Sequence, residues 1–372
     1  MVTSWDRHCG IYTYSRPLVE EMRRQGHDVQ VICHTDAKPS YGVHPVIDLT
    51  RPEWYTALER KVADLQPDVV HIQFEYGLFS RHRYEEQLGS GAADAFELAS
   101  SLFRWRLLGQ ATVMTMHSDN EGVADRLAYI DAIGSLLGAT IVHTPHAAKP
   151  SGEVRIIPHM APTQAFFPKP KERFGYPGRL VVGMVGYPEW YKRYDWFVRL
   201  WPEIAERAPE NALLVVACAP RPGSETGERC SLELRETIHS SERRYSILDL
   251  PVLLDSEGFL ELVASFDVLA LPYQSAAASG PSMAACAVGT PVVASAVGGL
   301  RSYVESSDAG LIVDPDDAAG FRDAVVRLLQ DEPLRVELSE KARRYAEYVS
   351  VERTAMRHLE LYREVIERTK VL

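Results

Sequence analysis

The stretch LVVGMVG, residues 180–186, decides the fold class. It is a short apolar run rich in valine that ends at a glycine, as a β-strand does where it enters a loop. Similar runs occur on both sides of it and alternate with segments of helical periodicity. Because strands that alternate with helices are typical of βαβ units, the sequence predicts an α/β protein with parallel sheets.

The expected strands form two sets. The first set comprises residues 2–4, 29–33, 68–74, 111–116, 140–144 and 154–158. The second set comprises residues 180–186, 212–217, 246–250, 268–271, 291–294 and 311–313. We therefore expect two Rossmann-like, doubly wound domains. Since open parallel sheets bind ligands at the carboxyl ends of their strands, we expect the two domains to face each other across a cleft.

Residues 160–179 separate the two sets. They contain four prolines and two glycines without sustained periodicity, which is typical of a linker. We expect an N-terminal domain at residues 1–165, a linker at 166–178, a C-terminal domain at 179–350, and a helix at 351–372 that braces the N-terminal domain.

The beginning of the chain carries two local signals. Only residues 2–4 are available for the first strand, which normally needs about five residues, so we expect the natural start to lie upstream of Met1. Leu18, Val19 and Met22 share one face of a helix, and Gly26 is expected to end it.

The composition excludes several classes of protein. A net charge of -11 and a pI near 5.6 do not supply the basic face that nucleic acid requires. The five cysteines lack CxxC spacing, which fits reduced thiols in the cytoplasm better than disulfides or a zinc site. No apolar run reaches the roughly 18 residues that a membrane span needs. We expect a cytoplasmic protein whose membrane contact, if it has one, is peripheral.

A series of motifs resembles the family 4 retaining glycosyltransferases, which have the GT-B fold. The motifs follow the family's order: CGIYTY at 9–14, GHDV at 26–29, PDVVHIQFE at 67–75, TMH at 115–117, IIPH at 156–159, Gly186 with Lys192, DVLALPY at 267–273, and GTPVVAS at 289–295 followed by Gly298 and Gly299. The resemblance implies a retaining transferase that moves a sugar from a nucleotide-sugar donor to a sugar, lipid-linked or small-molecule acceptor. We expect no cofactor and no metal, because Lys192 and helix amides can compensate the charge of the diphosphate and no ligand cluster is present.

The sequence departs from the family's pattern at three positions. Ala276 and Ala284 stand where the family usually carries two glutamates that hold donor hydroxyls, and Tyr187 stands where it usually carries an arginine. Ser279 and Gly280 fit a branch with a Ser-Gly step in place of the glutamate-rich loop. The departures therefore concern the identity of the donor more than the type of reaction.

The resemblance assigns the donor diphosphate to a set of residues in both domains: Gly10, Gly186, Lys192, Arg193, Ser279 and Gly280. A leaving diphosphate needs fixed positive groups, and a lysine together with the first amides of a helix supplies them. We expect Lys192 to act in catalysis and Arg193 to substitute for the missing arginine. The alternatives are a solvated surface lysine, a turn glycine at Gly10, and a Ser279 that only caps the helix.

Two residues of the first domain are candidates for the other substrate. His117 follows a parallel strand, where ligands collect, and is expected to contact the transferred sugar or the acceptor hydroxyl as a catalytic residue. Glu75 leaves another strand and is expected to bind the acceptor. His71 and Gln73 alternate with it and are expected to pack on the face of that strand.

Other features have simpler explanations. His143 and His146 lack a third metal ligand, and Asp316 with Asp317 precedes a helix that they can cap, so we expect no metal site. Residues 102–108 combine aromatic and basic side chains, which fits either a membrane edge or a buried helix with exposed arginines.

Two other functions remain open from the residues alone. A nucleotide-sugar 2-epimerase of the same architecture needs acid and base groups over the sugar carbon, and no suitable carboxylate pair stands out. A catalytically silent nucleotide-sugar-binding protein is compatible with the missing glutamates.

Overall fold

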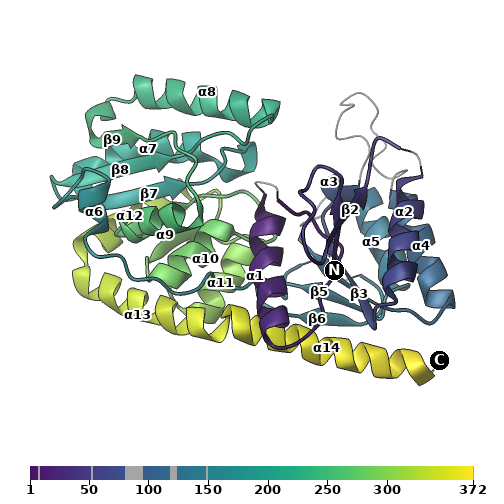
Figure 1. Cartoon of the computed structure of the whole chain (residues 1–372). Coiled ribbons are helices and arrows are strands. Elements are labelled where there is room, and N and C mark those ends of the chain that lie inside the picture. Colours follow the sequence, from purple (N-terminus) through teal and green to yellow (C-terminus); the bar gives the residue numbers. More distant parts are fainter. Residues whose placement is uncertain (7–8, 52, 80–94, 118–123, 148–149, 372) are drawn as a thin grey trace. The chain divides into compact units, whose positions relative to one another are not determined.

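The computed structural model describes residues 1–6, 9–51, 53–79, 95–117, 124–147 and 150–371. The chain divides into two compact units. Unit 1 consists of Met1–His159 together with Val351–Leu372, and unit 2 consists of Met160–Ser350. Each unit is built on its own parallel sheet (Figure 1).

The sheet of unit 1 has two blocks of strands that a single residue joins. β1 (Val31–His34) pairs with β2 (Val43–Ile47), and the second block is β3 (Val69–Phe74), β4 (Ala111–Met116), β5 (Ala139–Val142) and β6 (Val154–Ile156), in that order. Val2 forms parallel bridges to Ile32 of β1 and to Ile72 of β3. The first expected strand is thus reduced to a single bridging residue.

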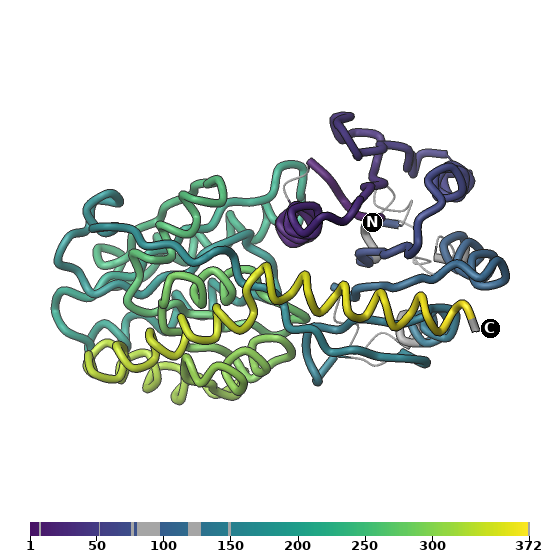
Figure 2. Tube along the Cα trace, turned by 60° about the horizontal axis from the view of Figure 1, so that its bottom comes forward, coloured from purple at the N-terminus to yellow at the C-terminus, as the bar shows by residue number. Residues whose placement is uncertain are grey.

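Helices cover both faces of this sheet. The helices of unit 1 are α1 (Gly10–Arg24), α2 (Trp54–Leu65), α3 (Tyr76–Phe79), α4 (Ala95–Leu107), α5 (Ala124–Gly134) and α14 (Val351–Val371). α2, α4 and α5 pack in series, while α14 packs against α1 and β4 (Figure 2). A Cβ at Gly138 would lie only 2.3 Å from Cγ1 of Val365, so the glycine permits α14 to lie close to the sheet.

Unit 2 has a six-stranded sheet in the order β12-β11-β10-β7-β8-β9. Its strands are β7 (Leu180–Val185), β8 (Ala212–Ala217), β9 (Ile247–Asp249), β10 (Val268–Leu271), β11 (Val292–Ser295) and β12 (Gly310–Val313). All the neighbouring strands pair in parallel. The strand order reverses direction between β7 and β10, which is the position at which such sheets bind ligands.

The helices of unit 2 form two layers. They are α6 (Pro170–Arg173), α7 (Tyr194–Arg207), α8 (Glu225–Ser240), α9 (Ser256–Ala264), α10 (Gly280–Val288), α11 (Gly298–Ser307), α12 (Ala318–Gln330) and α13 (Glu332–Tyr348), with short 3-10 turns η2 (Trp190–Lys192) and η3 (Arg244–Ser246). α7 contacts α8 and α12, whereas α10 contacts α9 and α13. Figure 1 shows α7 and α8 on one side of the sheet and α9 and α10 on the other.

The α/β architecture with two doubly wound parallel sheets confirms the fold class expected from the sequence. The units meet in sequence at His159 and Met160, upstream of the stretch 166–178 expected as a linker. That stretch belongs to unit 2, where α6 packs on α9 and Lys171 pairs with Asp267 at 2.6 Å.

The strand β2 was missed by the sequence analysis. It is an edge strand with the sequence VHPVI, and its three central residues are only half-buried. Proline lacks the N–H group that a central strand uses on both sides, so it is confined to edges such as this one.

Candidate functional site

The first part of the candidate site lies where β7 of unit 2 ends. Gly186 follows β7 with φ at 116°, a conformation that side chains rarely adopt. A Cβ at this position would lie 3.4 Å from Nζ of Lys192 and 3.7 Å from Cγ of Pro281. The glycine therefore lets Lys192 and the start of α10 approach the end of the strand.

Lys192 is buried, with only 8% of the residue exposed. Its Nζ donates a hydrogen bond of 2.8 Å to the carbonyl oxygen of Tyr187, and within the described part of the chain it forms no ion pair. Burial lowers the pKa of this ammonium to about 8. The alternative of a solvated surface lysine is therefore wrong, because η2 turns the side chain inward.

Aromatic rings surround this ammonium. Nζ lies 5.9 Å from the ring centroid of Tyr194 and 5.7 Å from that of Tyr273. Tyr194 donates from its hydroxyl to the carbonyl oxygen of Val185, 2.8 Å away, and this contact ties α7 to the end of β7. Aromatic faces attract cations, so the rings offset part of the cost of burying the charge.

The start of α10 supplies the second positive element. The Ser279 side chain accepts a hydrogen bond from the Ser282 amide and caps the helix, and Pro281 occupies its first turn. Gly280 is the first helical residue and is exposed. Because first-turn amides have no partner within a helix and the helix dipole is positive there, this end attracts anions.

The loop before α10 is held by close backbone contacts. The amide of Gly299 donates to the carbonyl oxygen of Ala276, 2.6 Å away. Ala276 in this loop and Ala284 within α10 are both buried. The two positions at which the resemblance implies glutamates therefore carry small side chains packed inside unit 2.

The side chain of Arg193 contacts a different set of residues from that of Lys192. Its guanidinium lies 4.5 Å from the ring centroid of Trp196, donates to the carbonyl oxygen of Pro315 and pairs with Asp316 at 3.3 Å. The arginine next in sequence to Lys192 is thus already neutralised by a carboxylate.

Sequence reasoning missed Arg221. This residue follows β8, and its guanidinium carbon lies 5.0 Å from the ring centroid of Tyr187. The rule that ligands gather at the carboxyl ends of parallel strands points to this loop, because 212–217 was an expected strand. The proximity to Tyr187 depends on the pairing of β7 with β8, which sequence alone does not give.

His117 lies at the carboxyl end of β4 in unit 1, as expected. Its Nε2 donates to Oε1 of Gln73 over 2.7 Å, and the Gln73 amide nitrogen in turn lies 3.4 Å from Nε2 of His71. His71 receives a second hydrogen bond from the Thr115 hydroxyl at 2.8 Å, and its Nδ1 bonds the hydroxyl of Tyr362 on α14. Gln73 and His71 thus form a hydrogen-bond network besides packing on the strand.

Three histidine rings of unit 1 gather around Tyr14 of α1. The Tyr14 ring centroid lies 5.0 Å from that of His117, 5.1 Å from that of His143 and 4.9 Å from that of His159. Burial holds the pKa of His117 well below its usual range and lowers that of His143 to about 3, with further lowering by the neighbouring histidines. The rings of His117 and His143 are therefore neutral at pH 7.

The remaining candidates of unit 1 stand at element ends. Gly10 is the first residue of α1, is exposed, and a Cβ there would meet no atom within 4 Å. Glu75 follows β3 directly and is half-buried. Both lie at the carboxyl side of the sheet, because Gly10 comes after the Val2 bridge and Glu75 after β3.

The described residues contain no group of three side chains suited to hold a metal ion. His143 donates from Nδ1 to the Ile157 carbonyl oxygen, while the Asp317 side chain caps α12 by accepting from the Gly320 amide.

Among the described segments, no helix is long and apolar enough to cross a membrane. On α4, Leu107 is 70% exposed and Trp105 is buried, so the stretch 102–108 has both an outer and an inner face.

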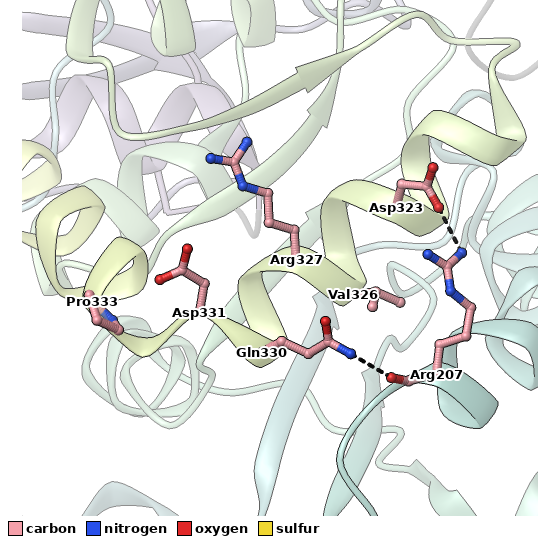
Figure 3. Close-up of a pocket in the computed structure, with 7 residues that line it drawn as sticks. All are labelled: Arg207, Asp323, Val326, Arg327, Gln330, Asp331 and Pro333. Carbon is pink, nitrogen blue, oxygen red and sulfur yellow. Dashed lines mark hydrogen bonds and ion pairs between the residues drawn. The ribbon is translucent and has the colours of Figure 1, made fainter.

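A surface pocket of 480 Å³ lies elsewhere in unit 2 (Figure 3). Its lining comes from the end of α7, from α12 and from the start of α13: Arg207, Asp323, Val326, Arg327, Gln330, Asp331 and Pro333. Arg207 pairs with Asp323 at 2.7 Å, and its carbonyl oxygen accepts from Gln330. Since a crossover helix ends near the amino end of the next strand, this pocket lies away from the ends of β7 and β8 that carry Lys192 and Arg221.

Comparison with known proteins finds a family match within unit 2. Residues 178–331 match the family described as Glycosyl transferases group 1. This segment is less than half of the chain, and it contains Gly186, Lys192, Arg221 and the start of α10.

Similar proteins include two D-inositol 3-phosphate glycosyltransferases. That of Corynebacterium aurimucosum is 34% identical over 173 residues, which are 46% of this chain and 39% of the relative. That of Salinispora arenicola is 34% identical over 200 residues, which are 53% of this chain and 44% of the relative. The similarity thus spans less than half the length of these relatives.

Solved structures resemble the chain over most of its length. A sucrose-phosphate synthase from Thermosynechococcus elongatus has a TM-score of 0.77 at 19% identity and covers 96% of this chain and 94% of its own. Anabaena HepE, solved in complex with UDP-glucose, has a TM-score of 0.71 at 12% identity. The match covers 100% of this chain and 98% of HepE. The likeness shows that the chain has the expected GT-B fold.

Proposed function

We propose that the protein is a glycosyltransferase that moves a sugar from a nucleotide-sugar donor to an acceptor hydroxyl. The observation that carries the proposal is Lys192. Its buried ammonium has no carboxylate partner among the described residues and stands beside Gly186 and the start of α10. A charge buried without a counter-ion is costly, so a site that keeps one is suited to an anionic ligand.

The proposed ligand of this site is the donor diphosphate. As the bond from the sugar carbon to the diphosphate breaks, negative charge grows on the leaving oxygen, and Lys192 and the first amides of α10 are fixed in place to stabilise it. The match of residues 178–331 to the glycosyltransferase group supports this assignment. The nucleotide sugars bound to HepE and to a trehalose-6-phosphate protein of E. coli support a nucleotide-sugar donor.

We assign the acceptor to residues of unit 1. His117 is neutral and its Nε2–H is committed to Gln73, so its Nδ1 is left as an acceptor for a substrate hydroxyl. Glu75 at the end of β3 is the second proposed acceptor contact. The family 4 resemblance favours retention, in which the new bond forms on the face that the leaving group departs and the acceptor proton passes to the departing phosphate oxygen.

We further propose that turnover needs no divalent metal and takes place in the cytoplasm. Lys192 and the α10 amides supply positive charge where many transferases use a metal. All five cysteines are free thiols, which fits a reducing compartment.

The test uses purified protein with a panel of nucleotide sugars, with and without acceptor extracts, and follows nucleotide release. Release that depends on an acceptor supports a transferase, and NMR of the product anomer decides on retention. An altered sugar on an intact nucleotide would instead identify an epimerase, and binding without turnover a silent binder. A chelator should leave the rate unchanged; loss of activity that magnesium or manganese restores would contradict the metal-free proposal.

A further inference from the structure

Arg221 and Lys192 are held by the same residue. The Tyr187 carbonyl oxygen accepts from Nζ of Lys192 at 2.8 Å, and the Tyr187 ring lies 5.0 Å from the guanidinium carbon of Arg221. Tyr187 follows β7 and Arg221 follows β8, and these two strands are neighbours in register. Two cations from the segments that follow adjacent strands therefore stand at the carboxyl end of the sheet.

Within the described part of the chain, Arg221 forms no ion pair, and its Nε is buried without a hydrogen-bond partner. Two other arginines of unit 2 differ in this respect: Arg193 pairs with Asp316, and Arg235 pairs with Asp249. The charge of Arg221 also adds to the lowering of the Lys192 pKa, after the larger effect of burial. The two cations thus repel each other; Cys218 and Glu189 raise the Lys192 pKa, but among the described residues no carboxylate forms an ion pair with either cation.

We propose that Arg221 binds the donor diphosphate together with Lys192, with the Tyr187 ring holding the plane of the guanidinium. This inference rests on the proposed function of the same site. A planar guanidinium donates two parallel hydrogen bonds to phosphate oxygens, and stacking on an aromatic ring fixes the direction of its N–H groups. A bound diphosphate would neutralise both cations and supply the acceptor that the Arg221 guanidinium lacks.

The test measures the binding of UDP, GDP, ADP, CDP and dTDP to the full chain by calorimetry at pH 7.5. The nucleoside diphosphate bound most tightly by the wild type is then titrated into Arg221→Met. We expect the dissociation constant to rise about 10- to 100-fold, the range for loss of a charge-assisted contact. If Arg221→Met does not fold, Arg221→Gln replaces it, because glutamine keeps a polar side chain without the charge. Its dissociation constant should rise by a similar factor.

Arg243→Met is the matched control. Arg243 also lies over a tyrosine ring, at 6.0 Å from the centroid of Tyr245, in another part of unit 2, and its substitution should leave the affinity unchanged. Equal affinities of wild type and the Arg221 variants would overturn the inference alone. Failure of the wild type to bind any of the five nucleotides would overturn the proposed donor site and the inference with it.

Discussion

The Nε2 nitrogen of His117 lies 2.7 Å from Oε1 of Gln73. A carbonyl oxygen only accepts, so the imidazole proton resides on Nε2, and the contact of the Gln73 amide nitrogen with His71 fixes the orientation of that amide. The tautomer of His117 is thus set from inside the sheet, and its Nδ1 lone pair faces away from Gln73.

Replacing Gln73 by methionine should leave the imidazole proton of His117 free to occupy either Nε2 or Nδ1. The proposed hydrogen bond from a substrate hydroxyl to Nδ1 would then form in only part of the molecules, and we expect kcat/KM to fall on the order of 10-fold. Nitrogen NMR of the imidazole should show both tautomers. Gln110→Met, which removes a side-chain bond to the Pro67 carbonyl, is the control. Unchanged kcat/KM with a mixed tautomer would remove His117 from the acceptor site.

Acid should destabilise unit 1 through its buried histidines. Burial lowers the pKa of His143 to about 3 and of His358 to about 4, and it holds the pKa of His71 and His117 well below the usual range. The unfolded chain binds these protons below pH 6.5 while the folded chain does not, so stability is complete above pH 6.5 and falls as the pH drops toward 4. Each histidine contributes about 1.4 kcal/mol per pH unit in that window.

The measurement is the free energy of unfolding by urea from pH 7.5 to 4.5. His143→Asn keeps a donor for the Ile157 carbonyl but does not titrate. The slope of the free energy of unfolding against pH should therefore fall by the amount that corresponds to about one proton. A slope identical to that of the wild type would show that His143 is not held neutral by the fold.

Lys192→Met should separate stability from function. The lowering of the Lys192 pKa from 10.5 to about 8 means that its charge opposes folding by about 3 kcal/mol at neutral pH. Removing the charge should therefore stabilise the protein, but the variant also loses the hydrogen bond to Tyr187. We expect the free energy of unfolding to rise by about 1 to 2 kcal/mol, with a higher melting temperature. Turnover should fall roughly 30- to 1000-fold, because the leaving diphosphate loses its charge-assisted contact.

The melting temperature and the turnover of wild type and Lys192→Met are measured on the same preparations, the turnover with one identified donor. Lys169→Met is the control, because that lysine side chain is 75% exposed and pairs with Glu172 on the surface of unit 2. A variant with normal turnover would exclude Lys192 from the site, and a lower melting temperature would show that its charge is compensated in the fold.

Donor affinity should depend on pH above neutrality. Lys192 loses its proton near pH 8 in the free protein, and a bound diphosphate raises that pKa, so binding takes up a proton above pH 8. The association constant for a nucleoside diphosphate should be level from pH 7 to 8 and then fall up to 10-fold per pH unit. Lys192→Arg, which stays charged, should bind with little pH dependence. A flat profile for the wild type would contradict the assignment of Lys192.

Much of the fold was predictable because its central strands are continuous apolar runs. Ala111–Met116, Ala212–Ala217 and Val268–Leu271 were expected with the bounds that the structure has. Helix α1 begins at Gly10, well before the periodic face around Leu18, since Cys9 caps it and is not among the residues that usually signal a helix start.

The candidate site was predictable only where spacing along the chain carries the signal. The interval from Gly186 to Lys192 lies within one loop, and the structure brings the two residues together. The burial of Lys192 and the position of Arg221 over Tyr187 depend on side chains from η2 and from the loop after β8. Such contacts between separate segments leave no pattern in a single sequence.

The division of the chain has a consequence for its synthesis. Unit 2 is one continuous segment, whereas unit 1 includes α14, which follows unit 2 in the chain and packs on α1 and β4. On the ribosome, residues 1–159 therefore emerge together with all of unit 2 before the helix that completes unit 1. Until α14 has been made, the surface around Tyr14 and Gly138 that this helix covers stays exposed in the nascent chain.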